Sequence, residues 1–88
     1  MSKPIILTVD DEPQVLNAVE RDLRQHYRGD YRIVKAGSGA EALETIQRLK
    51  QRNAPVALLL ADQRMPSLQA FRVLAQSYSR MGLRIKVN

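Results

Sequence analysis

The stretch Ile5-Ile6-Leu7-Thr8-Val9-Asp10-Asp11-Glu12-Pro13 decides the fold, because an apolar run leads directly into three carboxylates and a proline. Short runs rich in β-branched residues, without polar alternation, indicate a strand that is covered on both faces. The run Val56-Ala57-Leu58-Leu59-Leu60-Ala61 is of the same kind and ends at Asp62. The chain therefore contains two predicted central strands, and both lead into acidic residues.

Helical spacing predicts the segments between these strands. From about residue 12 to residue 27 the apolar positions follow a helical stripe, with Pro13 in the first turn, where its missing N–H costs nothing. Ser38-Gly39-Ala40-Glu41 matches a capping box, which predicts a second helix to about Arg52. The first stripe consists of Val15, Leu16, Val19 and Leu23, and the second of Leu43, Ile46 and Leu49.

The remaining segments complete a regular alternation. Residues 31–36 alternate polar and apolar side chains, as in an edge strand. Met65-Pro66-Ser67 leads into a predicted third helix that ends at Gly82, and residues 83–87 form a possible fourth strand. This order predicts one α/β domain over residues 1–88: a doubly wound parallel sheet of strand order 2-1-3-4, with helices on both faces.

Composition limits the classes of function. The 88 residues suffice for one small domain, and 44% hydrophobic with 26% charged residues fits a soluble globular protein. No apolar run is long enough for a membrane span, and no signal peptide is evident, so we expect a cytoplasmic protein without membrane partners. The absence of cysteine excludes disulfides and thiol chemistry.

The net charge of +5 raises the alternative of nucleic-acid binding. The basic residues are scattered along the predicted helices, no known nucleic-acid motif is present, and the aromatic residues do not interleave with the cations. Pairs such as Glu20/Arg24 and Glu44/Arg48 instead fit solvated helix faces. We therefore expect no nucleic-acid partner for this domain.

The acidic residues gather where function is expected. In a parallel sheet of this order, ligands bind beyond the carboxyl ends of the strands, where the strand order reverses. That point lies between the first and third strands, which are followed by Asp10-Asp11 and by Asp62. Adjacent strands are about 4.8 Å apart, so these carboxylates can share one cation, and hard oxygen ligands suit Mg²⁺.

Three motifs together resemble the receiver domain of two-component response regulators. They are Val9-Asp10-Asp11-Glu12-Pro13, Ala36-Gly37-Ser38-Gly39-Ala40-Glu41-Ala42-Leu43 and Asp62-Gln63-Arg64-Met65-Pro66. The resemblance spans nearly the whole chain in order and implies a flavodoxin-like fold. It further implies a non-enzymatic signalling module that accepts a phosphoryl group from a sensor histidine kinase or a phosphotransfer protein.

The resemblance also implies roles for single residues. Asp62 would be the phosphoacceptor and a metal ligand, Asp11 the direct Mg²⁺ ligand, and Asp10 a ligand through water. Arg64 would offer its backbone carbonyl to the metal. No further catalytic residue is implied, because the family's phosphate-binding Ser/Thr and Lys positions have no counterpart here.

The chain departs from the family in three ways. It stops at Asn88, so the fifth strand and last helices of the family are missing, and Lys86 lies inside the fourth strand rather than at the family's lysine position. Ala70 replaces a usual glycine. A truncated receiver without an output domain, acting as a phosphorylation-independent interaction module, is therefore the alternative. We expect its open fourth strand to be covered by a partner or a second copy.

Plainer explanations remain for several residues. Asp10, Asp11 and Asp62 could serve as helix caps or solvated strand ends, and Asp11 could do this as an N-cap while binding metal. Glu12 fits a first-turn residue that stabilises the helix dipole. His26 fits a surface residue, and Gly37-Ser38-Gly39 lacks the lysine of a phosphate loop. An aspartyl-phosphate phosphatase needs an Asp two residues after the nucleophile, where Glu12 and Arg64 stand instead.

Overall fold

A computed structural model describes residues 3–27, 29–61 and 84–87 of the chain. Its elements, in chain order, are β1 (Ile5–Val9), α1 (Pro13–Tyr27), β2 (Arg32–Ala36), α2 (Gly39–Gln51), β3 (Val56–Ala61) and β4 (Arg84–Val87). The predicted third helix and the turn at Met65-Pro66 lie outside the described residues. The predicted strands and the first two helices are confirmed to within one residue at each described boundary.

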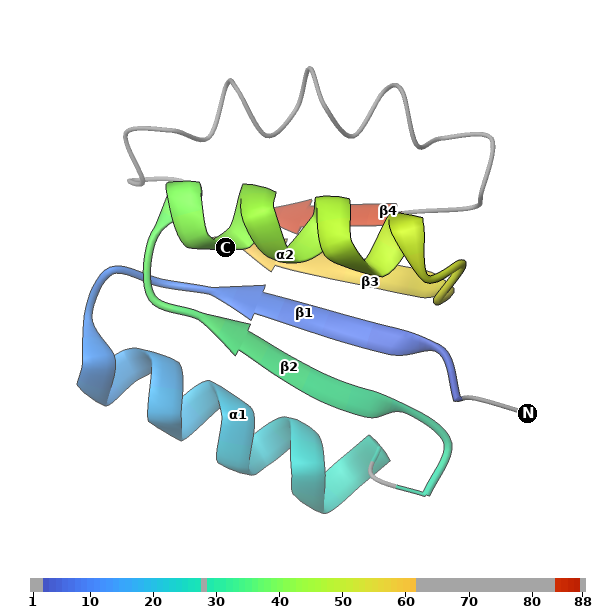
Figure 1. The fold of residues 1–88 in the computed structure, drawn as a ribbon. Coiled ribbons are helices and arrows are strands. Elements are labelled where there is room, and N and C mark those ends of the chain that lie inside the picture. Colours follow the sequence, from blue (N-terminus) through green and yellow to red (C-terminus); the bar gives the residue numbers. More distant parts are fainter. Residues whose placement is uncertain (1–2, 28, 62–83, 88) are drawn as a thin grey trace.

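The four strands form one parallel sheet in the order β2-β1-β3-β4. Ile6 pairs with Ile33 of β2 and with Leu58 of β3, and Leu59 pairs with Ile85 of β4. All carboxyl ends of the strands therefore lie at the same edge of the sheet (Figure 1). The molecule is an α/β protein with a parallel sheet, as the alternation of elements predicts.

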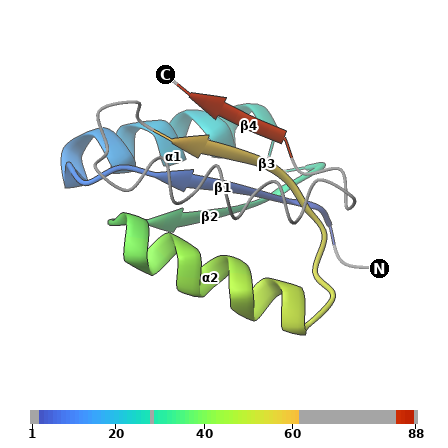
Figure 2. The same ribbon diagram turned by 90° about the horizontal axis from the view of Figure 1, so that it is seen from above.

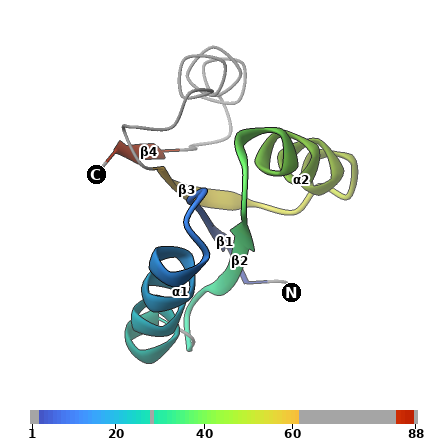
Figure 3. The same ribbon diagram turned by 90° about the vertical axis from the view of Figure 1, so that its left-hand side faces the viewer.

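The helices α1 and α2 cover opposite faces of the sheet. Figure 2 shows the sheet between the two helices, and Figure 3 shows them on its two sides near β1 and β2. Lys35 of β2 contacts α1, while its neighbour Ala36 belongs to the cluster that packs against α2. Successive residues of β2 thus face different helices, and β1 beside it is buried along its whole length.

The main cluster of buried hydrophobic residues lies on the α2 side of the sheet. Leu7 and Leu59, which pair across β1 and β3, are both completely buried. Around them lie the small and branched residues Val9, Ala36, Ala42, Ile46 and Ala61. The strand order confirms that both predicted strands are central, and β1 is buried throughout, whereas only Leu59 and Ala61 of β3 are buried and its other residues are half-buried.

The apolar stripe on α1 includes one exposed residue. Leu16 is buried, and Val19 and Leu23 are half-buried, but Val15 is 40% exposed. In an α-helix, neighbouring residues point about 100° apart, so with Leu16 directed at the sheet Val15 lies toward the margin of the stripe. The sequence predicts only that these residues share a helical stripe, and Val15 is its one exposed member.

The ends of α2 have clear local causes. Ser38 is the N-cap, and its Oγ accepts a hydrogen bond from the backbone N–H of Glu41 at 3.1 Å. The Glu41 carboxylate accepts from the N–H of Gly37 at 3.0 Å, one residue before the usual capping-box partner. After Arg52, the C-cap, Asn53 adopts a positive φ of 55°, a left-handed conformation that Asn tolerates and that ends the helix.

Candidate acidic site at the carboxyl ends of the strands

Asp10 is fixed at the end of β1 by bonds to two different elements. Its backbone N–H donates to the carbonyl of Ala36 at 3.2 Å, which extends the β1–β2 pairing by one step. Its Oδ1 accepts from the N–H of Glu12 at 2.8 Å. The residue is only 8% exposed, so this bond offsets part of the cost of burying its polar group.

Asp11 and Glu12 are exposed at the turn between β1 and α1. The N–H of Leu16 donates to the carbonyl of Glu12 at 2.9 Å, which is the first bond of the α1 ladder. Glu12 therefore occupies the capping position directly before Pro13, rather than a place in the first turn. Asp11, one residue earlier, is exposed, so a ligand can reach its carboxylate.

The end of β3 lies directly beside the end of β1. Val9 of β1 pairs with Ala61 of β3 in the parallel register. In the sequence, Asp10 follows Val9 and Asp62 follows Ala61. Asp62 and Arg64 themselves lie outside the described residues. The structure thus brings Asp10 and Asp11 to the edge that the sequence predicts, next to the strand that leads into Asp62.

The described residues alone do not form a metal site. Among them, no group of three or more His, Cys, Asp and Glu is close enough to hold a metal ion. Asp10 and Asp11 supply two carboxylates, so a metal site with three carboxylates at this edge requires Asp62. Oxygen donors of this type match the preference of Mg²⁺.

The position of Lys86 in β4, the strand next to β3, bears directly on the resemblance to receivers. Lys86 pairs with Leu60 and is followed in β4 by Val87, so it lies within the strand rather than beyond its carboxyl end. This agrees with the predicted departure from the family's lysine position.

Two other candidates have structural roles in the described chain. The N–H of Gly37 is bonded to Glu41, so the loop Gly37-Ser38-Gly39 serves as a helix cap. His26 is exposed on α1, and its Nδ1 lies 2.8 Å from the carbonyl oxygen of Asp22. Both observations agree with the plainer explanations.

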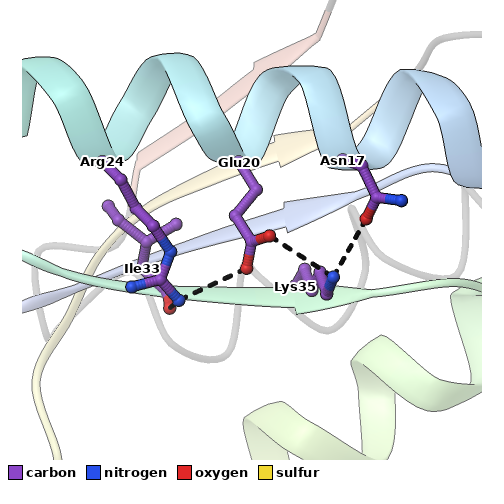
Figure 4. Close-up of polar contacts among 5 residues, drawn as sticks. All are labelled: Asn17, Glu20, Arg24, Ile33 and Lys35. Carbon is purple, nitrogen blue, oxygen red and sulfur yellow. Dashed lines mark hydrogen bonds and ion pairs between the residues drawn. The ribbon is translucent and has the colours of Figure 1, made fainter.

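A polar cluster between α1 and β2 has only a partial signal in the sequence. Arg24 and Lys35 both lie 3.3 Å from the carboxylate of Glu20, and Lys35 Nζ donates to Asn17 Oδ1 at 2.9 Å (Figure 4). The spacing of Glu20 and Arg24 predicts their pair. No local pattern indicates Lys35, since it joins the cluster from a different element.

The cluster changes the acidity of Glu20. Partial burial raises the pKa of this carboxyl, but hydrogen bonds from Lys35 and Arg24 and their positive charges outweigh that effect. The pKa of Glu20 therefore lies below its ordinary value. The cluster fastens α1 to β2 on the face away from the α2 core.

No protein-family model and no curated protein matches the chain. None of the helices in the described ranges 3–27, 29–61 and 84–87 is long and apolar enough to cross a membrane.

Proposed function

We propose that this chain is a receiver-type phosphoacceptor of a two-component phosphorelay, with a flavodoxin-like arrangement of its doubly wound sheet. In this proposal Asp62 accepts a phosphoryl group from a sensor histidine kinase or a phosphotransfer protein, and the reaction depends on Mg²⁺. The pairing of Val9 with Ala61 supports it most directly, because it aligns the strand ends that lead into Asp10-Asp11 and into Asp62.

The described residues fit the roles that the proposal gives them. Asp11 is exposed and offers a carboxylate to a cation, whereas Asp10 is nearly buried with its Oδ1 bonded to Glu12. Asp10 thus suits a positioned ligand that acts through water. The backbone carbonyl of Arg64 is the remaining proposed protein ligand.

The proposed reaction is a direct phosphoryl transfer. A carboxylate oxygen of Asp62 forms a bond to phosphorus while the bond to the donor nitrogen breaks, and the electron pair stays on the donor imidazole. A bound Mg²⁺ would neutralise charge on the phosphoryl oxygens during this step. The carboxylates of this chain would hold the cation and present the nucleophile.

The test uses a small acyl-phosphate donor with Mg²⁺ and intact-mass measurement. We expect one added phosphoryl group, absent in Asp62→Ala and after chelation of the metal, and retained in the matched control Asp22→Ala on the exposed surface of α1. We expect a low yield or a short-lived adduct, since no family-type lysine holds the phosphoryl group. Modification that persists in Asp62→Ala would refute the assignment.

The alternative is an interaction module that works without phosphorylation. The position of Lys86 inside β4 favours it, because a receiver's response relies on a lysine beyond a strand end. An unmodified protein under the donor conditions above, with partner binding equal in parent and Asp62→Ala, would support this alternative. Sustained release of free phosphate would instead indicate a phosphatase.

A further inference from the structure

One peptide group joins the candidate acidic site to the start of α2. It is the trans peptide between Ala36, the last residue of β2, and Gly37. Its C=O accepts a hydrogen bond from the N–H of Asp10 at 3.2 Å, and its N–H donates to the Glu41 carboxylate at 3.0 Å. The loops that lead into α1 and α2 lie at the same edge of the sheet (Figure 1). We call this peptide group, between residues 36 and 37, the bridging peptide.

The bridging peptide links the positions of its two partners. A peptide group is planar and rigid, so its C=O and its N–H cannot turn independently. When Glu41 fixes the direction of the N–H, it therefore also fixes the direction in which the C=O meets Asp10. Bonding of the N–H to a carboxylate also makes the C=O of the same group a stronger acceptor, because hydrogen bonds in a chain polarise one another.

Asp10 is held on both its backbone and its side chain. The bridging peptide binds its N–H, and its Oδ1 accepts from the N–H of Glu12 at 2.8 Å. The residue is only 8% exposed, so its carboxylate has little room to adjust. A shift of its backbone therefore carries the carboxylate with it.

The bond from Gly37 to Glu41 has a role besides helix capping. In the usual capping box, the glutamate accepts from the N–H of the N-cap residue, which is Ser38 here. Glu41 instead accepts from the N–H one residue earlier, in the same peptide that binds Asp10. The cap itself is the bond from the N–H of Glu41 to Ser38 Oγ at 3.1 Å. Substitutions can therefore separate the two bonds.

We propose that Glu41 is a positioning residue for the Mg²⁺ site and acts on Asp10 through the bridging peptide. This role rests on the proposed function, in which Asp10 binds the metal through water. The Glu41 carboxylate holds the peptide and is not itself a ligand of the cation. A ligand that is held in place before the metal arrives loses less freedom on binding, which favours affinity.

The test is a Mg²⁺ titration of the full chain, in which the amide NMR shifts of Asp10 and Asp11 report the Kd. We expect Glu41→Ala to raise the Kd about threefold. This is less than the roughly tenfold loss for a direct partner of a metal ligand, because the effect passes through a peptide. Glu41→Gln removes the same charge but keeps an acceptor, so it should stay closer to the parent. Ser38→Ala removes the cap and leaves the Glu41 carboxylate, and should also stay close to the parent.

A second measurement needs no metal. In the metal-free protein, the amide proton of Asp10 should exchange with solvent faster in Glu41→Ala than in Glu41→Gln, because its acceptor is held less firmly. The matched control is Glu44→Ala, which removes an exposed carboxylate from the same helix. Its Asp10 amide should exchange at the rate of the parent.

The outcomes separate this role from the proposed function. An unchanged Kd in Glu41→Ala, with a parent that binds Mg²⁺, would overturn the role and leave the proposed function standing. A parent that binds no Mg²⁺ would overturn both, and faster Asp10 exchange in Glu41→Ala would then show that the bridging peptide serves the fold alone. Equal weakening by Glu41→Gln and Glu41→Ala would show that only charge matters. Equal weakening by Ser38→Ala would show that only the helix cap matters, and either result would also overturn the role.

Discussion

Asp10 illustrates how one residue can serve both the fold and a candidate site. Its backbone extends the sheet toward Ala36, and its side chain closes the turn before α1 through the N–H of Glu12. Its neighbour Asp11 makes no such bond within the described residues and is exposed. Removal of the Asp11 carboxylate should therefore affect a bound cation more than the fold.

Mg²⁺ should raise the thermal stability of the protein, because it relieves carboxylate repulsion that arises only when the strand ends come together. At about ten times its Kd, a ligand of the folded state adds about 1.4 kcal/mol to the free energy of unfolding. We expect Asp11→Ala to lose this gain and Asp22→Ala to keep it in thermal melts. Equal Mg²⁺ stabilisation of Asp11→Ala and the parent would eliminate the site.

Glu20 should make stability depend on pH. Its folded pKa is depressed, so its contribution is present above the ordinary carboxyl pKa and is lost as pH falls through the folded value. We expect Glu20→Gln to lower the free energy of unfolding by about 0.5–1 kcal/mol at neutral pH, and the difference to vanish in acid. Urea titrations at several pH values measure this.

The matched control is Glu44→Gln, because the Glu44–Arg48 pair is 3.7 Å long and both side chains are about 70% exposed. It should change stability little at any pH. A difference between parent and Glu20→Gln that persists unchanged in acid would show that Glu20 acts through packing instead.

At the scale of elements, α2 depends on its caps. Ser38→Ala should lower the free energy of unfolding by about 1 kcal/mol, because the N–H of Glu41 loses its partner. Ser38→Asp keeps an acceptor and should stay near the parent. Gln47→Ala, an exposed change within α2, is the control for general effects on the helix. Equal losses in Ser38→Ala and Ser38→Asp in urea unfolding would contradict the capping role.

The two outer strands differ in how their edges are protected. The carbonyl of Ala36 in β2 accepts a hydrogen bond from the N–H of Asp10 and so points toward β1. Because carbonyls alternate sides along a strand, the carbonyl of Ile33, three residues earlier, points to the free edge. Arg24 reaches that carbonyl at 3.5 Å, and Lys35 is held nearby by α1 (Figure 4). Charged side chains of this kind discourage further strand pairing at β2.

For the whole molecule, the edge at β4 should govern association. Within the described chain, β4 pairs with β3 alone and forms the end of the sheet. Every second residue of an edge strand presents unpaired N–H and C=O groups that another chain can use. A domain of this size also has only about 5–15 kcal/mol of net stability, so burying this edge matters.

We therefore expect concentration-dependent self-association or dependence on a partner, with β4 exchanging its amide protons faster than β1. Sedimentation velocity across the micromolar range and hydrogen exchange measure both. A compact monomer at the highest concentrations, with slow exchange at Ile85 and Val87, would overturn this expectation.

The sequence by itself determined the features that depend on local spacing. These are the alternation of strands and helices, the apolar central strands β1 and β3, the capping box at Ser38, and the ion pairs between residues four apart. Each arises from residues within one turn or one strand, where backbone geometry fixes which side chains meet. The roles of Asp62 and Arg64 stay predictions.

Only the tertiary structure decided which distant residues share a surface. It exposed Val15, joined Lys35 to Asn17 and Glu20, and placed Arg32 beside the start of β1. It also set the register that aligns Val9 with Ala61. Such contacts follow from how the chain returns on itself, and packing of the whole sheet, rather than local preference, selects that path.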